Sequence, residues 1–97
     1  MMEHNGPVRV SVIIVSYNVS AYLDQAIRAV KRAAQGVPTE IWVVDNASPD
    51  DSVAATRQNH PDVHLIANAH NPGFGIANNQ AMELAKGTYF LILNPDT

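Results

Sequence analysis

Short apolar runs alternate with helix-like segments along this chain of 97 residues. Four runs are rich in β-branched and other apolar side chains, as strands buried on both faces are: residues 8–16, 40–45, 63–67 and 88–93. Apolar spacing and helix start and stop residues predict three helices between them: residues 20–35, 49–59 and 75–86. The predicted pattern is therefore β-α-β-α-β-α-β.

Local signals predict where the helices begin and end. Ser20 can cap the first helix, and Gly36 is a natural stop. In the second helix, Ser48 would be the N-cap, Pro49 the first helical residue and Asp51 the partner in a capping box.

The same spacing predicts which side chains are buried. The third helix is expected to bury five residues: Ile76, Ala77, Ala81, Leu84 and Ala85. The first helix is expected to turn three basic residues to water: Arg28, Lys31 and Arg32. Trp42 and Phe90 lie in predicted strands and are expected in the core.

The alternation of strands and helices favours an α/β fold, a doubly wound, mainly parallel sheet of four strands with helices on both faces. Strand order 3-2-1-4 is our hypothesis, because periodicity alone does not fix the order. The carboxyl ends of parallel strands meet at one edge, where open sheets bind ligands. The four tips expected there are polar: residues 16–18, 45–46, 68 and 94–96.

Composition limits the class of protein. The chain is long enough for one domain or part of one, and 46% of its residues are hydrophobic. A net charge of −3 argues against nucleic acid as a partner. There is no cysteine, and no apolar run approaches the roughly 18 residues of a transmembrane helix. Residues 1–7 are expected to form a loose tail, not a signal peptide. We therefore predict a cytoplasmic location, and peripheral attachment to the membrane stays open for the full-length protein.

Asp45 stands at the tip of the second strand, next to the central strand in the hypothesised order. Its carboxylate could accept hydrogen bonds from a ribose hydroxyl or a base N–H, as tip carboxylates do in dinucleotide folds. The alternative is a structural role in an Asx turn or a helix cap. Position alone leaves both roles open.

Asn94 and Asp96 follow the fourth strand and offer an amide and a carboxylate oxygen. Such oxygen ligands suit Mg²⁺ or Mn²⁺, with substrate phosphates completing the site. Asn-Pro-Asp is also good turn sequence, so a simple β-turn is the alternative. The four histidines share no ligand-type spacing and are expected to be surface or loop residues.

Gly73 and Gly75 precede the third helix and could let the backbone approach a ligand. They do not form the dinucleotide fingerprint, which follows the first strand and has a third glycine. Asn78 and Asn79, in the first turns of that helix, point toward the same edge and could touch a base or a phosphate.

Four motifs in order resemble the N-terminal half of the family 2 (GT-A fold) inverting glycosyltransferases: VSVIIVSYN at 10–18, VVDNASPD at 43–50, NPGFGIANN at 71–79 and LILNPD at 91–96. The resemblance covers about residues 8–97. The last two motifs are most similar to the rhamnosyltransferase-like branch. The resemblance implies a Rossmann-like nucleotide-sugar-binding half of a GT-A domain, without the acceptor half.

The resemblance also implies a nucleotide-diphosphate sugar as the ligand. Three residues would cradle the nucleotide: Ser16, Tyr17 and Asn18. Asp45 would contact the base or ribose. Asn94 and Asp96 would fall on the family's Asp-x-Asp motif, which holds the diphosphate-bound Mg²⁺ or Mn²⁺.

Two departures from the family pattern matter. Asn94 replaces the first acidic residue of the metal motif, so metal binding rests more on Asp96. Asn78 stands where the family often has arginine, which puts one donor contact in doubt.

The family's catalytic base and acceptor site lie well downstream, beyond Thr97, so we expect no transfer by these residues alone. The implied reaction is inverting sugar transfer to a hydroxyl in cell-wall or polysaccharide biosynthesis, with a deoxythymidine-diphosphate sugar favoured.

Two other functions remain open. A non-catalytic interaction module with this fold would bind a protein partner and show no metal-dependent nucleotide binding. A phosphoacceptor receiver domain fits less well, because such domains need an acidic pair after the first strand. Whatever the function, an apolar fourth strand at the sheet edge invites pairing with another copy. We therefore expect a homodimer or higher assembly through residues 88–93.

Overall fold

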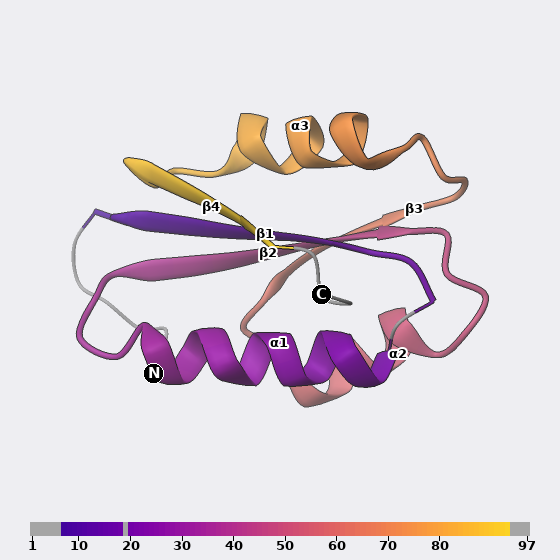
Figure 1. Cartoon of the computed structure of the whole chain (residues 1–97), viewed down its shortest axis with the longest axis horizontal. Coiled ribbons are helices and arrows are strands. Elements are labelled where there is room, and N and C mark those ends of the chain that lie inside the picture. Colours follow the sequence, from indigo (N-terminus) through magenta and orange to yellow (C-terminus); the bar gives the residue numbers. More distant parts are fainter. Residues whose placement is uncertain (1–6, 19, 94–97) are drawn as a thin grey trace.

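The computed structural model describes residues 7–18 and 20–93, which form a four-stranded parallel sheet (Figure 1). The elements are β1 (Val10–Ser16), α1 (Ser20–Ala33), β2 (Thr39–Asn46), α2 (Ser52–Asn59), β3 (His64–Asn68), α3 (Phe74–Leu84) and β4 (Tyr89–Leu93). The strand order is β3-β2-β1-β4, and every neighbouring pair is parallel. The predicted order and alternation are confirmed. The predicted tail, residues 1–7, lies almost wholly outside the described residues.

Helices cover both faces of the sheet, with α1 and α2 on one side and α3 on the other (Figure 1). Because strand side chains alternate between faces, the core has two halves. The half under α1 contains Val12, Ile14, Leu23, Ile27, Val30, Ile41 and Val43. The half under α3 contains Ile13, Val15, Val44, Ala77 and Ala81. Within the described residues, no helix combines the length and apolar character needed to cross a bilayer.

Three side chains predicted in the core are largely exposed: Ile76 (57%), Leu84 (55%) and Phe90 (43%). The helix α3 approaches the sheet through Ala77 and Ala81, so its larger residues lie to the sides. Phe90 belongs to β4, which among the described strands pairs only with β1. Trp42 is half-buried and stacks on His64, with ring centroids 4.3 Å apart.

One further expectation is wrong where α1 meets the end of α2. Lys31 does not face water, because its Nζ donates to Asp62 Oδ1 (2.8 Å) and lies 3.0 Å from His60 Nδ1. His60 is buried, and its Nε2 lies 2.7 Å from Asp24 Oδ1. Since an ammonium group can only donate, Lys31 donates to Nδ1 of the ring, and Nε2 is left to contact Asp24. These contacts fasten α1 to the segment that follows α2.

A polar cluster at the amino-terminal end of the sheet holds the chain between α3 and β4. The buried Glu40 carboxylate accepts hydrogen bonds from the Ser11 hydroxyl (2.6 Å) and the Lys86 N–H (2.6 Å). The Gly87 N–H donates to Ser11 Oγ (2.8 Å). A Cβ on Gly87 would lie only 2.6 Å from the Ser11 nitrogen. Close approach of two backbones therefore requires glycine at this position.

Gly87→Ala is expected to destabilise the fold. The added methyl group would overlap Ser11, and overpacking of this kind costs about 1–3 kcal/mol. Gly75→Ala is the matched control, because nothing lies within 4 Å of its added Cβ. Urea unfolding followed by circular dichroism measures both variants. Equal free energies of unfolding for the two variants would contradict the prediction.

Glu40 also makes stability depend on pH. Burial raises the pKa of its carboxyl group, but hydrogen bonds, chiefly from Ser11 and Lys86, and the nearby His64 together outweigh burial, and the net pKa lies below the ordinary 4.5. A lowered pKa in the folded state means that the unfolded chain takes up the proton first. The stabilisation from Glu40 is therefore complete above pH 4.5 and is lost as pH falls through the folded-state pKa.

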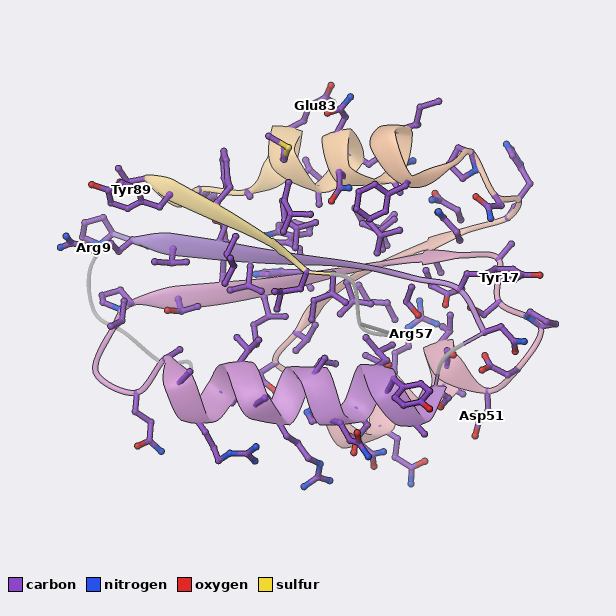
Figure 2. The ribbon with its side chains drawn as sticks, viewed as in Figure 1. Arg9, Tyr17, Asp51, Arg57, Glu83 and Tyr89 are labelled. Carbon is purple, nitrogen blue, oxygen red and sulfur yellow. The ribbon has the colours of Figure 1, made fainter. Side chains whose placement is uncertain are left out.

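Glu40→Gln should lower the free energy of unfolding at neutral pH by about 1–2 kcal/mol, because Ser11 and Lys86 lose a charged acceptor. The difference from the wild type should shrink as the pH falls below 4.5. Urea titrations at a series of pH values test this. Glu83→Gln is the control, since Glu83 is exposed on α3 (Figure 2). A difference that stays constant down to acid pH would refute the role given to Glu40.

Candidate functional site

The carboxyl ends of β1, β2 and β3 lie together at one edge of the sheet (right-hand side of Figure 1). The strand register places Ser16 beside Asp45 and Asn46 beside Asn68. Residues far apart in the sequence are therefore neighbours at this edge. Because open α/β sheets bind ligands at such an edge, it is the candidate functional site.

Asp45 is 2% exposed, and a single residue holds its carboxylate. The Ser48 N–H donates to Oδ2 (2.9 Å), and the Ser48 hydroxyl donates to Oδ1 (2.6 Å). A carboxylate that accepts from the N–H three residues on makes a local, cap-like contact, which is the structural role that the sequence left open as the alternative. Each carboxylate oxygen can accept a second hydrogen bond, for which the described residues provide no donor. A structural role for Asp45 thus leaves capacity for a ligand.

Ser48 also joins the tips of β1 and β2. Its Oγ accepts a hydrogen bond from the Asn18 N–H (2.7 Å) while donating to the carboxylate at the tip of β2. Asp50 makes a second link, because it accepts from the Ser20 N–H (3.3 Å) and from the N–H and hydroxyl of Ser52. The loops that leave the two strands are therefore fastened at two points.

The capping box predicted for α2 is wrong. The helix begins at Ser52, later than predicted, and Asp51 at its N-cap makes no side-chain hydrogen bond to the helix. Asp50 supplies the acceptor for Ser52 instead. Ser48 is not available as a cap, because its hydroxyl is engaged by Asp45. The contact of Ser48 with the buried carboxylate of Asp45 thus takes the place of the predicted cap, and α2 begins at Ser52.

Backbone strain is concentrated at the same edge. Within the described residues, the only non-glycine positions with positive φ are Asn18 (53°) and Ala47 (61°). Asparagine tolerates the left-handed region, whereas alanine enters it at a cost. Strain of this kind persists only where surrounding contacts enforce it, and it clusters at functional sites. The hydrogen bonds of Ser48 supply that enforcement here.

The side chains of Ser16 and Tyr17 differ in their exposure to solvent. Ser16 is 1% exposed, and its Oγ has no hydrogen-bond partner within the described part of the chain. An unpartnered buried hydroxyl is costly, so each case calls for an explanation. Tyr17 is 51% exposed, and its hydroxyl points away from the ribbon at the strand tips (Figure 2). The structure thus brings together four predicted site residues: Ser16, Tyr17, Asn18 and Asp45.

Asn78 and Asn79 lie in α3, on the opposite face of the sheet from Asp45. Asn78 is 5% exposed and donates from Nδ2 to the Phe74 carbonyl (3.1 Å). Its Oδ1 is buried with no partner among the described residues. Asn79 is exposed. These two residues therefore approach the edge separately from the Asp45 group.

An amide network that the sequence did not predict joins the strand tips to α3. Asn68 Nδ2 donates to Asn46 Oδ1 (3.0 Å) and to Gln80 Oε1 (2.9 Å), and Gln80 Nε2 donates back to Asn68 Oδ1 (3.1 Å). Asn46 Nδ2 reaches the carbonyl of Gly73 (3.5 Å), whose φ of 96° favours glycine. The network sets the loop before α3 against β2 and β3. The polar tips hinted at the two asparagines, but nothing in the sequence marked Gln80.

Asn94 and Asp96, the predicted metal ligands, lie outside the described residues. Within residues 7–18 and 20–93, no group of three or more histidine, aspartate or glutamate side chains could hold a metal ion.

Residues 11–97 match the model of the family described as Glycosyl transferase family 2. The chain belongs to glycosyl transferase family 2. Chondroitin synthase of Escherichia coli is 35% identical over 92 residues, which are 90% of this chain and 13% of that protein. The putative teichuronic acid biosynthesis glycosyltransferase TuaG of Bacillus subtilis is 32% identical over 91 residues, 90% of this chain and 35% of that protein. This family 2 chain thus spans a small part of these relatives.

Solved structures confirm the GT-A-like fold of this family 2 chain. The mannosyltransferase PcManGT from Pyrobaculum calidifontis, in complex with GDP-Man and Mn²⁺, has a TM-score of 0.76 at 29% identity, covering 94% of this chain and 30% of that one. Glucosyl-3-phosphoglycerate synthase from Mycobacterium tuberculosis, with Mn²⁺, UDP and glucosyl-3-phosphoglycerate, has a TM-score of 0.76 at 18% identity, covering 91% and 33%. The second likeness bears on the fold alone. Both neighbours hold a divalent metal together with a nucleotide ligand.

Ser48→Ala should destabilise the protein by about 1–3 kcal/mol, because the Asn18 N–H and one oxygen of buried Asp45 lose their partner. Ser48→Thr is the matched control, since it keeps a hydroxyl at the same place. Urea unfolding gives the stability, and amide hydrogen exchange at Asn18 reports the local opening. If Ser48→Ala is as stable as Ser48→Thr, the hydrogen bonds of Ser48 (the Ser48 clamp) are not what holds the ends of β1 and β2 together.

Proposed function

We propose that this chain is the donor-nucleotide-binding half of an inverting glycosyltransferase that uses a nucleotide-diphosphate sugar. The main support is the convergence of residues 16–18 and Asp45 at one edge of the sheet. Ser48 joins the strand ends there, and Asn18 and Ala47 have positive φ. Membership of family 2 and the nucleotide complexes of its structural neighbours agree with this use of the edge.

Each residue of the edge would have its own role in binding. The backbone and side chains of residues 16–18 would cradle the nucleotide. Asp45 would use its second acceptor positions for a ribose hydroxyl or a base N–H. The hydroxyl of Ser16, unpartnered within the described residues, would gain a hydrogen bond. The clamp through Ser48 would hold these groups in place before the ligand arrives, which reduces the ordering cost of binding.

Asn94 and Asp96 would hold Mg²⁺ or Mn²⁺ against the diphosphate. When bound, the ion stabilises the charge of the leaving diphosphate. Because asparagine contributes no charge, we expect metal binding to depend strongly on the nucleotide phosphates. Transfer to an acceptor hydroxyl also needs a base. We propose that the base and the acceptor site belong to the part of the longer relatives that this chain does not span. A cytoplasmic location stays a prediction.

A non-catalytic interaction module is the second candidate. One observation favours it: both oxygens of Asp45 already accept hydrogen bonds from Ser48, so the turn alone accounts for the carboxylate. This alternative predicts no metal-dependent nucleotide binding at the strand tips.

Amide chemical shifts during titration with nucleotide diphosphate and Mg²⁺ separate the two candidates. We expect shifts at Tyr17, Asn18 and Asp45, and line broadening at Asp96 when Mn²⁺ replaces Mg²⁺. Among UDP, GDP and dTDP, the resemblance to the rhamnosyltransferase-like branch favours dTDP. Unchanged shifts at Tyr17, Asp45 and Asp96 at saturating nucleotide would overturn the proposal in favour of the module.

Matched carboxylate variants sharpen the titration. Asp45→Asn should weaken nucleotide binding about tenfold, because a charge-assisted hydrogen bond becomes a neutral one. Asp51→Asn removes a carboxylate from the same edge that makes no side-chain bond to α2, so its affinity should match the wild type. Equal affinities for both variants would mean that Asp45 is structural only.

A further inference from the structure

The chain leaves β2 between two side-chain anchors that lie on opposite faces of the sheet. Asp45 and Asn46 are consecutive strand residues, so their side chains point to opposite faces. On one face, the N–H and the hydroxyl of Ser48 bind the Asp45 carboxylate. On the other face, Asn46 Oδ1 accepts a hydrogen bond from Asn68 Nδ2 (3.0 Å). Ala47, with its φ of 61°, lies between the two anchors.

Gln80 fixes the second anchor through a reciprocal pair of hydrogen bonds. An amide side chain can face a partner with its oxygen or with its NH₂ group, so its partners set its orientation. Gln80 Oε1 accepts from Asn68 Nδ2 (2.9 Å), and Gln80 Nε2 donates to Asn68 Oδ1 (3.1 Å). Both ends of the Asn68 amide are thereby engaged, and its second N–H is directed to Asn46 Oδ1. The Asn46 amide then presents Nδ2 to the Gly73 carbonyl (3.5 Å).

Burial makes this network costly to break. Asn46 is 3% exposed, and Asn68 and Gln80 are half-buried. A buried amide that loses its partner bears the cost of its desolvation. Gln80 lies on the opposite face of the sheet from Asp45, so any influence on that carboxylate passes through the backbone that follows Asn46.

The strain at Ala47 depends on both anchors. Alanine stays in the left-handed region only where the surrounding contacts enforce it. Ser48 holds the chain after Ala47, and the side chain of Asn46 holds the chain before it. Without the anchor at Asn46, Ala47 is free to relax to negative φ. The Ser48 N–H would then turn away from Asp45 and leave its carboxylate without a fixed orientation.

We propose that Gln80 is a positioning residue of the donor-nucleotide site. Through the two asparagine amides, it keeps Ala47 in the left-handed region and holds the Asp45 carboxylate in place for a nucleotide. Gln80 itself does not touch the ligand. The link to the nucleotide rests on the proposed function, whereas the effect on the backbone after β2 exists without ligand.

Amide hydrogen exchange without ligand tests the anchor. Gln80→Met keeps the length of the side chain but removes both hydrogen bonds to the Asn68 amide. The Ser48 amide should then exchange about tenfold faster, which corresponds to the strain that alanine releases on leaving the left-handed region. Glu83→Met, at an exposed position of the same helix, is the matched control and should leave this exchange unchanged. The Ile14 amide, in the central strand, reports global unfolding and shows whether the change is local.

Further variants trace the route of the effect. Ala47→Gly in the Gln80→Met background should restore slow exchange at Ser48, because glycine adopts positive φ without strain. In an Asn46→Ala background, Gln80→Met should have no further effect, because the anchor is already lost. Gln80→Glu keeps the acceptor for Asn68 Nδ2 and loses the donor, and it serves if Gln80→Met fails to fold.

Nucleotide affinity tests the link to the donor site. In titrations with dTDP and Mg²⁺, Gln80→Met should bind about threefold more weakly than the wild type, because only part of its molecules hold Asp45 in the competent orientation. Glu83→Met should bind as the wild type does. Equal nucleotide affinities or equal Ser48 exchange in these two variants would overturn the proposal. So would an effect of Gln80→Met that persists in full in the Asn46→Ala background. If Ser48 exchange responds as expected but the wild type binds no nucleotide diphosphate, the proposed function is wrong and the anchor stands.

Discussion

The register between β1 and β2 fixes the chemistry at both ends of the sheet. It places Ser11 beside Glu40 at the amino-terminal end and Ser16 beside Asp45 at the carboxyl-terminal end. Each pair combines a buried hydroxyl with a buried carboxylate. A slip of one residue would turn every side chain of the strand to the other face. It would therefore expose the core and separate both pairs at once.

The two pairs differ in how far the protein itself satisfies them. Ser11 donates to Glu40, and the backbone of residues 86–87 completes the cluster. At the other end, Ser16 and Asp45 do not bond to each other: Asp45 turns to Ser48, and the Ser16 hydroxyl has no partner among the described residues. The Ser11–Glu40 pair is thus satisfied within the protein, while the edge at Ser16 and Asp45 combines strain with unused hydrogen-bonding capacity. Binding sites have this second character, because a ligand supplies the missing contacts.

The layers could be predicted because strands buried on both faces need continuous runs of β-branched residues. The strand order could be predicted because right-handed crossovers leave few possible orders of four parallel strands. The contacts of residues that have several possible partners were harder to predict. Ser48 fits a capping box by spacing, yet the tertiary structure gives its hydroxyl to Asp45. Ile76 and Leu84 follow helical spacing, but α3 meets the sheet through its alanines. The resemblance singled out residues 16–18 and Asp45, whereas the amide network of Gln80 depends on contacts that no local pattern encodes.

The alanine contact of α3 determines what holds this helix on the sheet. The helix α1 inserts Leu23, Ile27 and Val30 into the core, so any sliding of α1 would break interlocked packing. Small residues give α3 no such interlocking, so hydrogen bonds fix its position: those between Asn68 and Gln80 of the helix, and those of Lys86 and Gly87 just after it. The loop that ends at Gly73 leads directly into α3, and Asn46 contacts its carbonyl. Loss of these hydrogen bonds would therefore release the helix and this loop together, while the strands beneath them stay in place.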